Sequence, residues 1–273
     1  MVSSSHVDAV TATAPVREPQ FGFPAQPSNA PYIALAAVAA VAGEVLKLPY
    51  GLASTSTDPW RILHEPLALT RLVVVLGSLY FVLAWLGVLA ANRIGFSKPL
   101  IAGSTGHARN AQAVTSAILL SLVAGAACGT LLFVAALFVP VTPPSPALTW
   151  PVALLGSLGA GLNEEVLFRL FLMSVFAWII VAISRRSMPN DSMVWLAIVT
   201  SSLLFAAAHL PQGRFVGPLT PIMVAYIIVG NSAAGGLFGW LFWRRGIVAA
   251  VIAHVTTDII LKVILPGIAS FPG

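Results

Sequence analysis

Long apolar stretches follow one another along almost the whole chain, and they limit it to a membrane-spanning fold. A crossing takes about 17 to 25 apolar residues. Seven stretches meet this length, at about residues 31–51, 69–92, 113–139, 151–184, 193–210, 219–243 and 246–265. Only 8% of the residues are charged, against about 25% in soluble proteins, too few for a water-facing surface. We therefore predict an all-α polytopic membrane protein, a bundle of about seven to eight transmembrane helices.

Two of the seven stretches depart from a simple span. Glu44, Lys47 and Pro49 interrupt the first one. The fourth is too long for one straight crossing. Its beginning, GSLGAG at residues 156–161, is compatible with a loop, a re-entrant turn or a close-packed helix. The sequence leaves these three alternatives open.

The chain is expected to divide into four parts. Residues 1–30 are rich in Ser, Thr, Pro and Ala and form a mobile N-terminal tail in this prediction. Residues 31–149 hold the first group of transmembrane helices, residues 150–265 hold the second, and residues 266–273 are a short C-terminal tail. The single cysteine, Cys128, excludes a disulfide framework and is expected to be a small buried hydrophobe.

The net charge of +5 reflects membrane topology rather than nucleic-acid binding, since no basic run interleaved with aromatic residues occurs. Basic residues mark cytoplasmic loops. With seven spans, eight basic residues share the side of the N-terminus: Arg17, Arg93, Lys98, Arg109, Arg185, Arg186, Arg244 and Arg245. Five lie on the other side: Lys47, Arg61, Arg71, Arg214 and Lys262. This bias predicts a cytoplasmic N-terminus, and the expected location of this multi-pass protein is the cell (plasma) membrane.

Few ionisable residues fall within the spans, and these are the functional candidates. Burying each costs several kcal/mol unless it is paired. They are Glu44, Lys47, Glu164, Glu165, Arg169, His209, His254, Asp258 and Lys262.

Helical spacing sorts the three charges of the fourth stretch. Glu165 and Arg169 are four residues apart and can form an ion pair on one helix face. Glu164 is turned by about 100° from Glu165, so it is available to a different partner. The pair alone is equally explained by charge neutralisation.

The later stretches repeat this spacing. His254 and Asp258 are four residues apart, and so are Phe205 and His209. Three helices therefore each bring forward a proton-handling or metal-ligating group, and a carboxylate with two imidazoles is suited to activating water. Taken singly, His209 is compatible with an interfacial histidine, and Asp258 with an orienting hydrogen bond to His254. Glu44 and Lys47 are expected to form a structural pair near a membrane boundary.

The three patterns together resemble those of a known family. EEVLFR (residues 164–169) is similar to its EExxxR motif, FAAAH (residues 205–209) to its FxxxH motif, and HVTTD (residues 254–258) to its third motif, a His followed four residues later by Asn or Asp. Their order on separate apolar spans resembles the CPBP family, the CAAX-prenyl endopeptidases and bacteriocin-processing enzymes also called Abi. The resemblance covers about residues 150–265.

This resemblance implies an intramembrane endopeptidase that cleaves a membrane-associated or lipidated protein or peptide. Glu164 would be the base that activates water, His209 and His254 would hold that water, a metal ion or the oxyanion, and Glu165 with Arg169 would fix the geometry of Glu164. Zinc is an option, with Glu164, His209 and His254 as ligands and Asp258 as a fourth or outer group.

The third motif departs from the Asn form of the family. Asp258 donates a hydrogen bond only when protonated, so it suits orienting His254 or accepting from a metal-bound water better than donating to an oxyanion. Two alternatives from other classes remain open. One is a catalytically silent scaffold or immunity-type protein of the same family. The other is a proton- or ion-coupled transporter, which the lack of repeated halves disfavours.

Overall fold

The structure is a computed structural model that describes residues 29–55, 57–96, 109–139, 148–214 and 217–265. The predicted tails at residues 1–30 and 266–273 lie outside these residues, apart from Asn29 and Ala30. The described residues form helices and no strands, as the composition predicts. The helices are α1 (Ala30–Ser54), η1 (Arg61–His64), α2 (Pro66–Arg93), α3 (Arg109–Ala136), α4 (Trp150–Glu165), η2 (Val166–Met173), α5 (Ser174–Ile183), α6 (Asp191–Ala208), α7 (Leu210–Gly213), α8 (Pro221–Arg245), α9 (Ile247–Ile259) and η3 (Ile260–Ile264).

Seven helical segments within the described residues are long and apolar enough to cross a membrane, which confirms the predicted fold class. They are Ala30–Ser54, Pro66–Arg93, Ala111–Ala136, Trp150–Ile183, Asp191–Gly213, Pro221–Arg245 and Ile247–Ile264. Even the first span is one helix, with Pro49 buried inside it.

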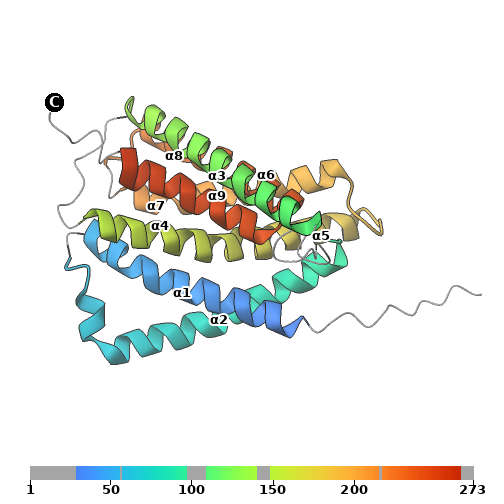
Figure 1. The fold of residues 1–273 in the computed structure, drawn as a ribbon, viewed down its shortest axis with the longest axis horizontal. Coiled ribbons are helices and arrows are strands. Elements are labelled where there is room, and N and C mark those ends of the chain that lie inside the picture. Colours follow the sequence, from blue (N-terminus) through green and yellow to red (C-terminus); the bar gives the residue numbers. More distant parts are fainter. Residues whose placement is uncertain (1–28, 56, 97–108, 140–147, 215–216, 266–273) are drawn as a thin grey trace, which may run out of the picture.

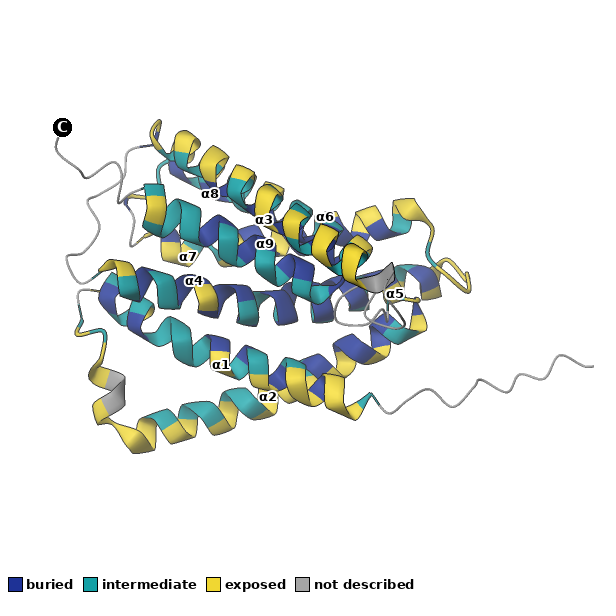
Figure 2. Ribbon diagram, viewed as in Figure 1, coloured by how far each residue is buried: buried dark blue, intermediate teal, exposed yellow. Residues whose placement is uncertain are grey.

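The spans pack around a central layer formed by α4 and α9. Helix α1 lies alongside α4, α3 alongside α9, and α6 alongside α8, while α8 also packs on α9 (Figure 1). Exposed residues lie on the outer faces of α2 and α3, and buried residues concentrate on the faces turned inward (Figure 2). Of the fourth span, 44% is buried, against 22% in each of the first three. The span that holds two carboxylates and an arginine therefore lies inside the bundle.

The long fourth span is continuous, because α4 passes into the π-helix η2 and then into α5. Its GSLGAG beginning is a close-packed helix, which settles the three alternatives. A Cβ on Gly159 would lie 2.5 Å from the carbonyl oxygen of Gly43, and one on Gly156 would lie 2.7 Å from the Tyr50 ring. The small residues thus let α1 approach α4 backbone to backbone.

We expect Gly159→Ala to lower the thermal unfolding midpoint of the detergent-solubilised protein, since overpacking costs about 1–3 kcal/mol. Gly236→Ala is the matched control, because a Cβ at Gly236 has nothing within 4 Å. That control should be neutral or slightly stabilising, since Ala is the better helix former. Equal midpoints for the two variants would contradict the close contact.

Candidate active site

The EExxxR motif builds a fully buried ion pair at the junction of α4 and η2. The Arg169 Nε lies 3.3 Å from the Glu165 Oε2, and neither side chain is exposed. The guanidinium also donates to the carbonyl of Gly235 at 3.2 Å and lies over the Phe205 ring at 4.6 Å. The i, i+4 pair predicted from spacing is therefore present, inside the protein rather than facing lipid.

The second oxygen of Glu165 reaches across to α9. The Nδ1 of His254 lies 2.8 Å from the Glu165 Oε1. Because an ionised carboxylate only accepts, Nδ1 carries the hydrogen and donates it, and in the neutral imidazole Nε2 then keeps its lone pair. Phe238 stacks on the imidazole at 4.7 Å between ring centroids. Glu165 thus contacts the imidazole of His254 directly, in addition to its pair with Arg169.

Glu164 faces both motif histidines. Its Oε2 lies 3.7 Å from the His209 Nε2 and 3.9 Å from the His254 Nε2. This oxygen is buried and has no hydrogen-bond partner among the described residues. His209 directly follows the last residue of α6, and its Nδ1 donates to the Phe205 carbonyl at 2.8 Å, so in the neutral imidazole its Nε2 is also an acceptor. Three acceptor atoms from three helices therefore converge.

These three acceptor atoms cannot hydrogen-bond one another. The site between them is therefore suited to a molecule that donates hydrogen bonds, or to an ion that accepts their lone pairs. Water does the first and a metal ion does the second. The chemistry of one carboxylate and two neutral imidazoles fits zinc, and the bond from Glu165 to His254 is typical of an oriented metal ligand. Over the described ranges, however, no three His, Cys, Asp or Glu side chains are arranged to hold a metal ion. We therefore derive no step through a metal ion, and metal binding is left to the test below.

Asp258 contacts a residue other than the one expected. Its Oδ2 accepts from the Nζ of Lys262 at 2.6 Å, one turn further along α9 and η3, whereas the bond to His254 comes from Glu165. Asp258 is 6% exposed, so its charge is held inside the bundle by the lysine.

The contact of one residue with the cluster was not predicted from the sequence. Lys47 forms the expected pair with Glu44, at 3.3 Å, but its Nζ also lies 2.9 Å from the Asn163 Oδ1 and 3.5 Å from the Glu164 Oε1. Lys47 is therefore part of the site rather than of a separate boundary pair. The sequence did contain a signal for this contact. Glu164 was left without a cationic partner, and Lys47 is a cation within another span.

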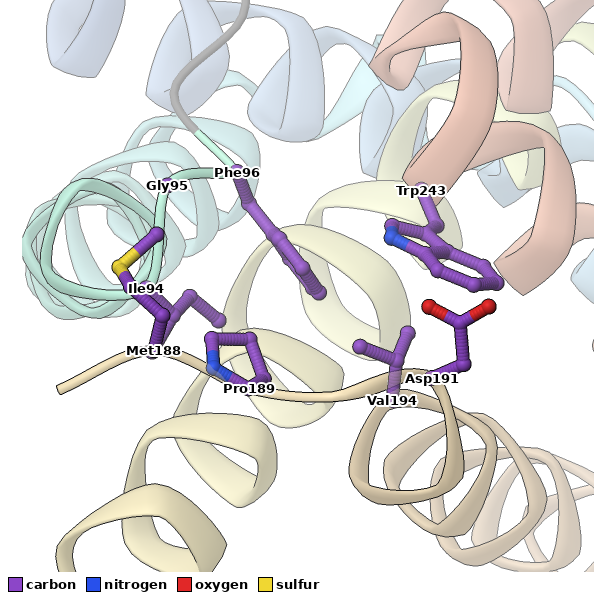
Figure 3. Close-up of a pocket in the computed structure, with 8 residues that line it drawn as sticks. All are labelled: Ile94, Gly95, Phe96, Met188, Pro189, Asp191, Val194 and Trp243. Atoms are coloured by element: carbon purple, nitrogen blue, oxygen red, sulfur yellow. The ribbon is translucent and has the colours of Figure 1, made fainter. Parts of the chain in front are cut away.

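A cavity elsewhere in the bundle is separate from this cluster (Figure 3). It is lined by Ile94, Gly95, Phe96, Met188, Pro189, Asp191, Val194 and Trp243. Asp191 begins α6 and His209 follows its end, so the cavity and the cluster lie a full helix length apart, about 27 Å. The cavity contains none of the motif residues.

Comparison with protein families adds one finding. Residues 146–260 match the family model described as Rce1-like, type II CAAX prenyl endopeptidase Rce1-like. This range contains all three motifs. No curated protein and no solved structure matches the chain.

Proposed function

We propose that the protein is an intramembrane endopeptidase of the CPBP family with Glu164 as its general base, because residues 146–260 match the Rce1-like CAAX prenyl endopeptidase model. One observation carries this proposal. The Glu164 Oε2 is buried, has no hydrogen-bond partner among the described residues, and faces two imidazole nitrogens at 3.7 and 3.9 Å. The proposed substrate is a membrane-associated or lipidated protein or peptide.

The proposed reaction is hydrolysis of a peptide bond by a water molecule bound between the three acceptors. The water donates one hydrogen to the Glu164 Oε2 and the other to an imidazole Nε2, which leaves an oxygen lone pair for the substrate carbonyl. As the oxygen attacks, Glu164 takes the first proton. It then gives this proton to the leaving nitrogen as the carbon–nitrogen bond breaks. The products are a carboxylic acid and an amine; the acid then passes the second hydrogen of the water to the amine, which leaves a carboxylate and an ammonium group.

The remaining motif residues are proposed to position these groups. Glu165 holds the ring of His254 through Nδ1, and Arg169 balances the charge of Glu165. The Phe205 carbonyl accepts from the Nδ1 of His209 and is proposed to hold that ring in the same way. Asp258, as an acceptor from Lys262, is assigned to positioning and not to donating to the oxyanion.

The proposed orientation keeps the N-terminus in the cytoplasm. Lys47 and Lys262 lie within the first and last spans, where each pairs with a carboxylate and is at most 30% exposed, whereas the paired Arg244 is 50% exposed. We therefore do not count these two lysines as loop charges. Eight basic residues then lie on the N-terminal side of the membrane and three on the other side, Arg61, Arg71 and Arg214. This larger bias supports a cytoplasmic N-terminus, and the plasma membrane remains the proposed location.

The proposal is tested by comparing the protein termini in membranes of cells that produce either the wild type or Glu164→Gln. A protease creates termini in at least one membrane protein that are present with the wild type and lost in the variant. An identical set of termini would favour a silent scaffold or immunity-type protein. Transport activity that depends on Glu164, with unchanged termini, would favour the transporter.

Metal dependence is tested on the same purified protein. Stoichiometric zinc that is lost in both His209→Ala and His254→Ala would assign the three acceptors to a metal, because each variant removes one donor. Full peptidase activity in protein freed of metal would show that the three acceptors bind the water without a metal ion.

A further inference from the structure

Helix α1 brings a cation to the proposed base from outside the family match at residues 146–260. The two oxygens of Glu164 have different neighbours. Oε1 lies 3.5 Å from the Lys47 Nζ, and Oε2 faces His209 and His254. The lysine therefore contacts the carboxylate on the oxygen that does not face the imidazoles.

A glycine contact places Lys47 at this distance. Gly43 is one turn before Lys47 on α1, and a Cβ on Gly43 would lie 2.6 Å from the Gly159 carbonyl oxygen. A Cβ on Gly159 would in turn lie 2.7 Å from the Lys47 Cγ. Gly159 precedes Glu164 by just over one helical turn. Larger residues at either glycine would push α1 away and take the lysine with it.

The lysine is held by three neighbours inside the bundle. Its ammonium has three donors, and three acceptors surround it: Glu44 at 3.3 Å, Asn163 at 2.9 Å and Glu164 at 3.5 Å. The Tyr80 hydroxyl donates to Glu44 at 3.0 Å and accepts from the Asn163 amide, which joins α1, α2 and α4. Since two carboxylates and an amide oxygen already surround the ammonium, Lys47 is better suited to holding Glu164 than to binding a negatively charged substrate.

We propose that Lys47 is a positioning residue for the general base. By holding the Oε1 of Glu164, Lys47 keeps the Oε2 turned toward His209 and His254. This fixes the position of the base relative to the bound water. This inference rests on the proposed function of Glu164. It assigns to α1 a role in the reaction that the motif-bearing helices do not supply.

The kinetic test uses purified protein in liposomes and a prenylated CAAX peptide as probe. Lys47→Met is expected to lower kcat about 10- to 100-fold, because misplacement of a reacting group by about 1 Å has effects of this size. KM should stay within about twofold, since the substrate does not touch Lys47. Lys47→Arg keeps the cation and should retain more of the wild-type kcat than Lys47→Met. Arg61→Met, which breaks an exposed ion pair with Glu65 on η1, is the control with unchanged kcat.

A second measurement does not depend on activity. Thermal unfolding midpoints are compared for Lys47→Met, Glu164→Ala and the double variant, since Ala, unlike Gln, has no side-chain oxygen to accept from Lys47. If the two side chains interact, the effects of the single variants are not additive, because either substitution alone already removes the interaction. Additive effects would overturn the contact.

The outcomes separate this inference from the proposed function. An active wild type, an inactive Glu164→Gln and a fully active Lys47→Met would overturn the role of Lys47 alone. A rise in KM with an unchanged kcat in Lys47→Met would also overturn it. A wild type that does not cleave the peptide would count against the proposed function and overturn any kinetic role for Lys47, whatever the unfolding data show.

Discussion

Glu164→Gln is expected to lower kcat about 10²- to 10⁴-fold, the usual contribution of a general base. Gln has the same size as Glu, and its amide oxygen can still accept from Lys47 at the position of the Oε1. The fold should therefore persist while the side chain can no longer take a proton from water. The measurement is the rate of peptide cleavage by purified protein, with insertion and unfolding midpoint recorded for the same samples.

Glu65→Gln serves as the matched control for this substitution. Glu65 precedes α2, and its side chain is 50% exposed in an ion pair with Arg61. Its loss should leave kcat unchanged, since it lies outside the cluster. Full activity of Glu164→Gln would remove Glu164 from the role of base, however well the variant folds.

Arg169→Met is expected to produce the largest loss of stability, about 3–5 kcal/mol, because it leaves the carboxylate of Glu165 buried without its cation. Both side chains of this pair are fully buried. The Met side chain fills most of the volume and adds no charge. The measurement is the unfolding midpoint in detergent, together with the yield of membrane-inserted protein.

A second substitution tests the reason for this loss. The double variant Glu165→Gln with Arg169→Met removes both charges and should be more stable than Arg169→Met alone. Arg244→Met is the matched control, because Arg244 is 50% exposed and lies 3.9 Å from Asp191, and such surface pairs contribute about 0–1 kcal/mol. If Arg169→Met unfolds like the control, the buried pair does not carry the stability assigned to it.

The spans could be predicted from sequence because the bilayer fixes both the length and the polarity of a crossing helix. That information is local, so the seven stretches and the seven helices agree. The GSLGAG segment could not be settled in the same way. Its conformation depends on Gly43 and Tyr50, which lie on another helix and more than a hundred residues away.

The site shows the same division between local and distant contacts. The pair of Glu165 and Arg169 follows from a four-residue spacing. Asp258 has a candidate partner four residues away on each side, His254 and Lys262, and spacing alone does not choose between them. Lys47 was assigned wholly to Glu44 because that pair satisfies it locally, whereas its contact with Glu164 spans 117 residues.

The central claim is that this protein hydrolyses a peptide bond with water activated by Glu164. The most direct test is mass spectrometry of a prenylated CAAX peptide incubated in ¹⁸O-labelled water with the wild type or with Glu164→Gln in liposomes. We predict that the wild type releases a fragment whose new carboxylate contains one ¹⁸O atom, and that the variant releases none. Equal cleavage by both proteins, or an intact peptide with the folded wild type, would contradict the claim.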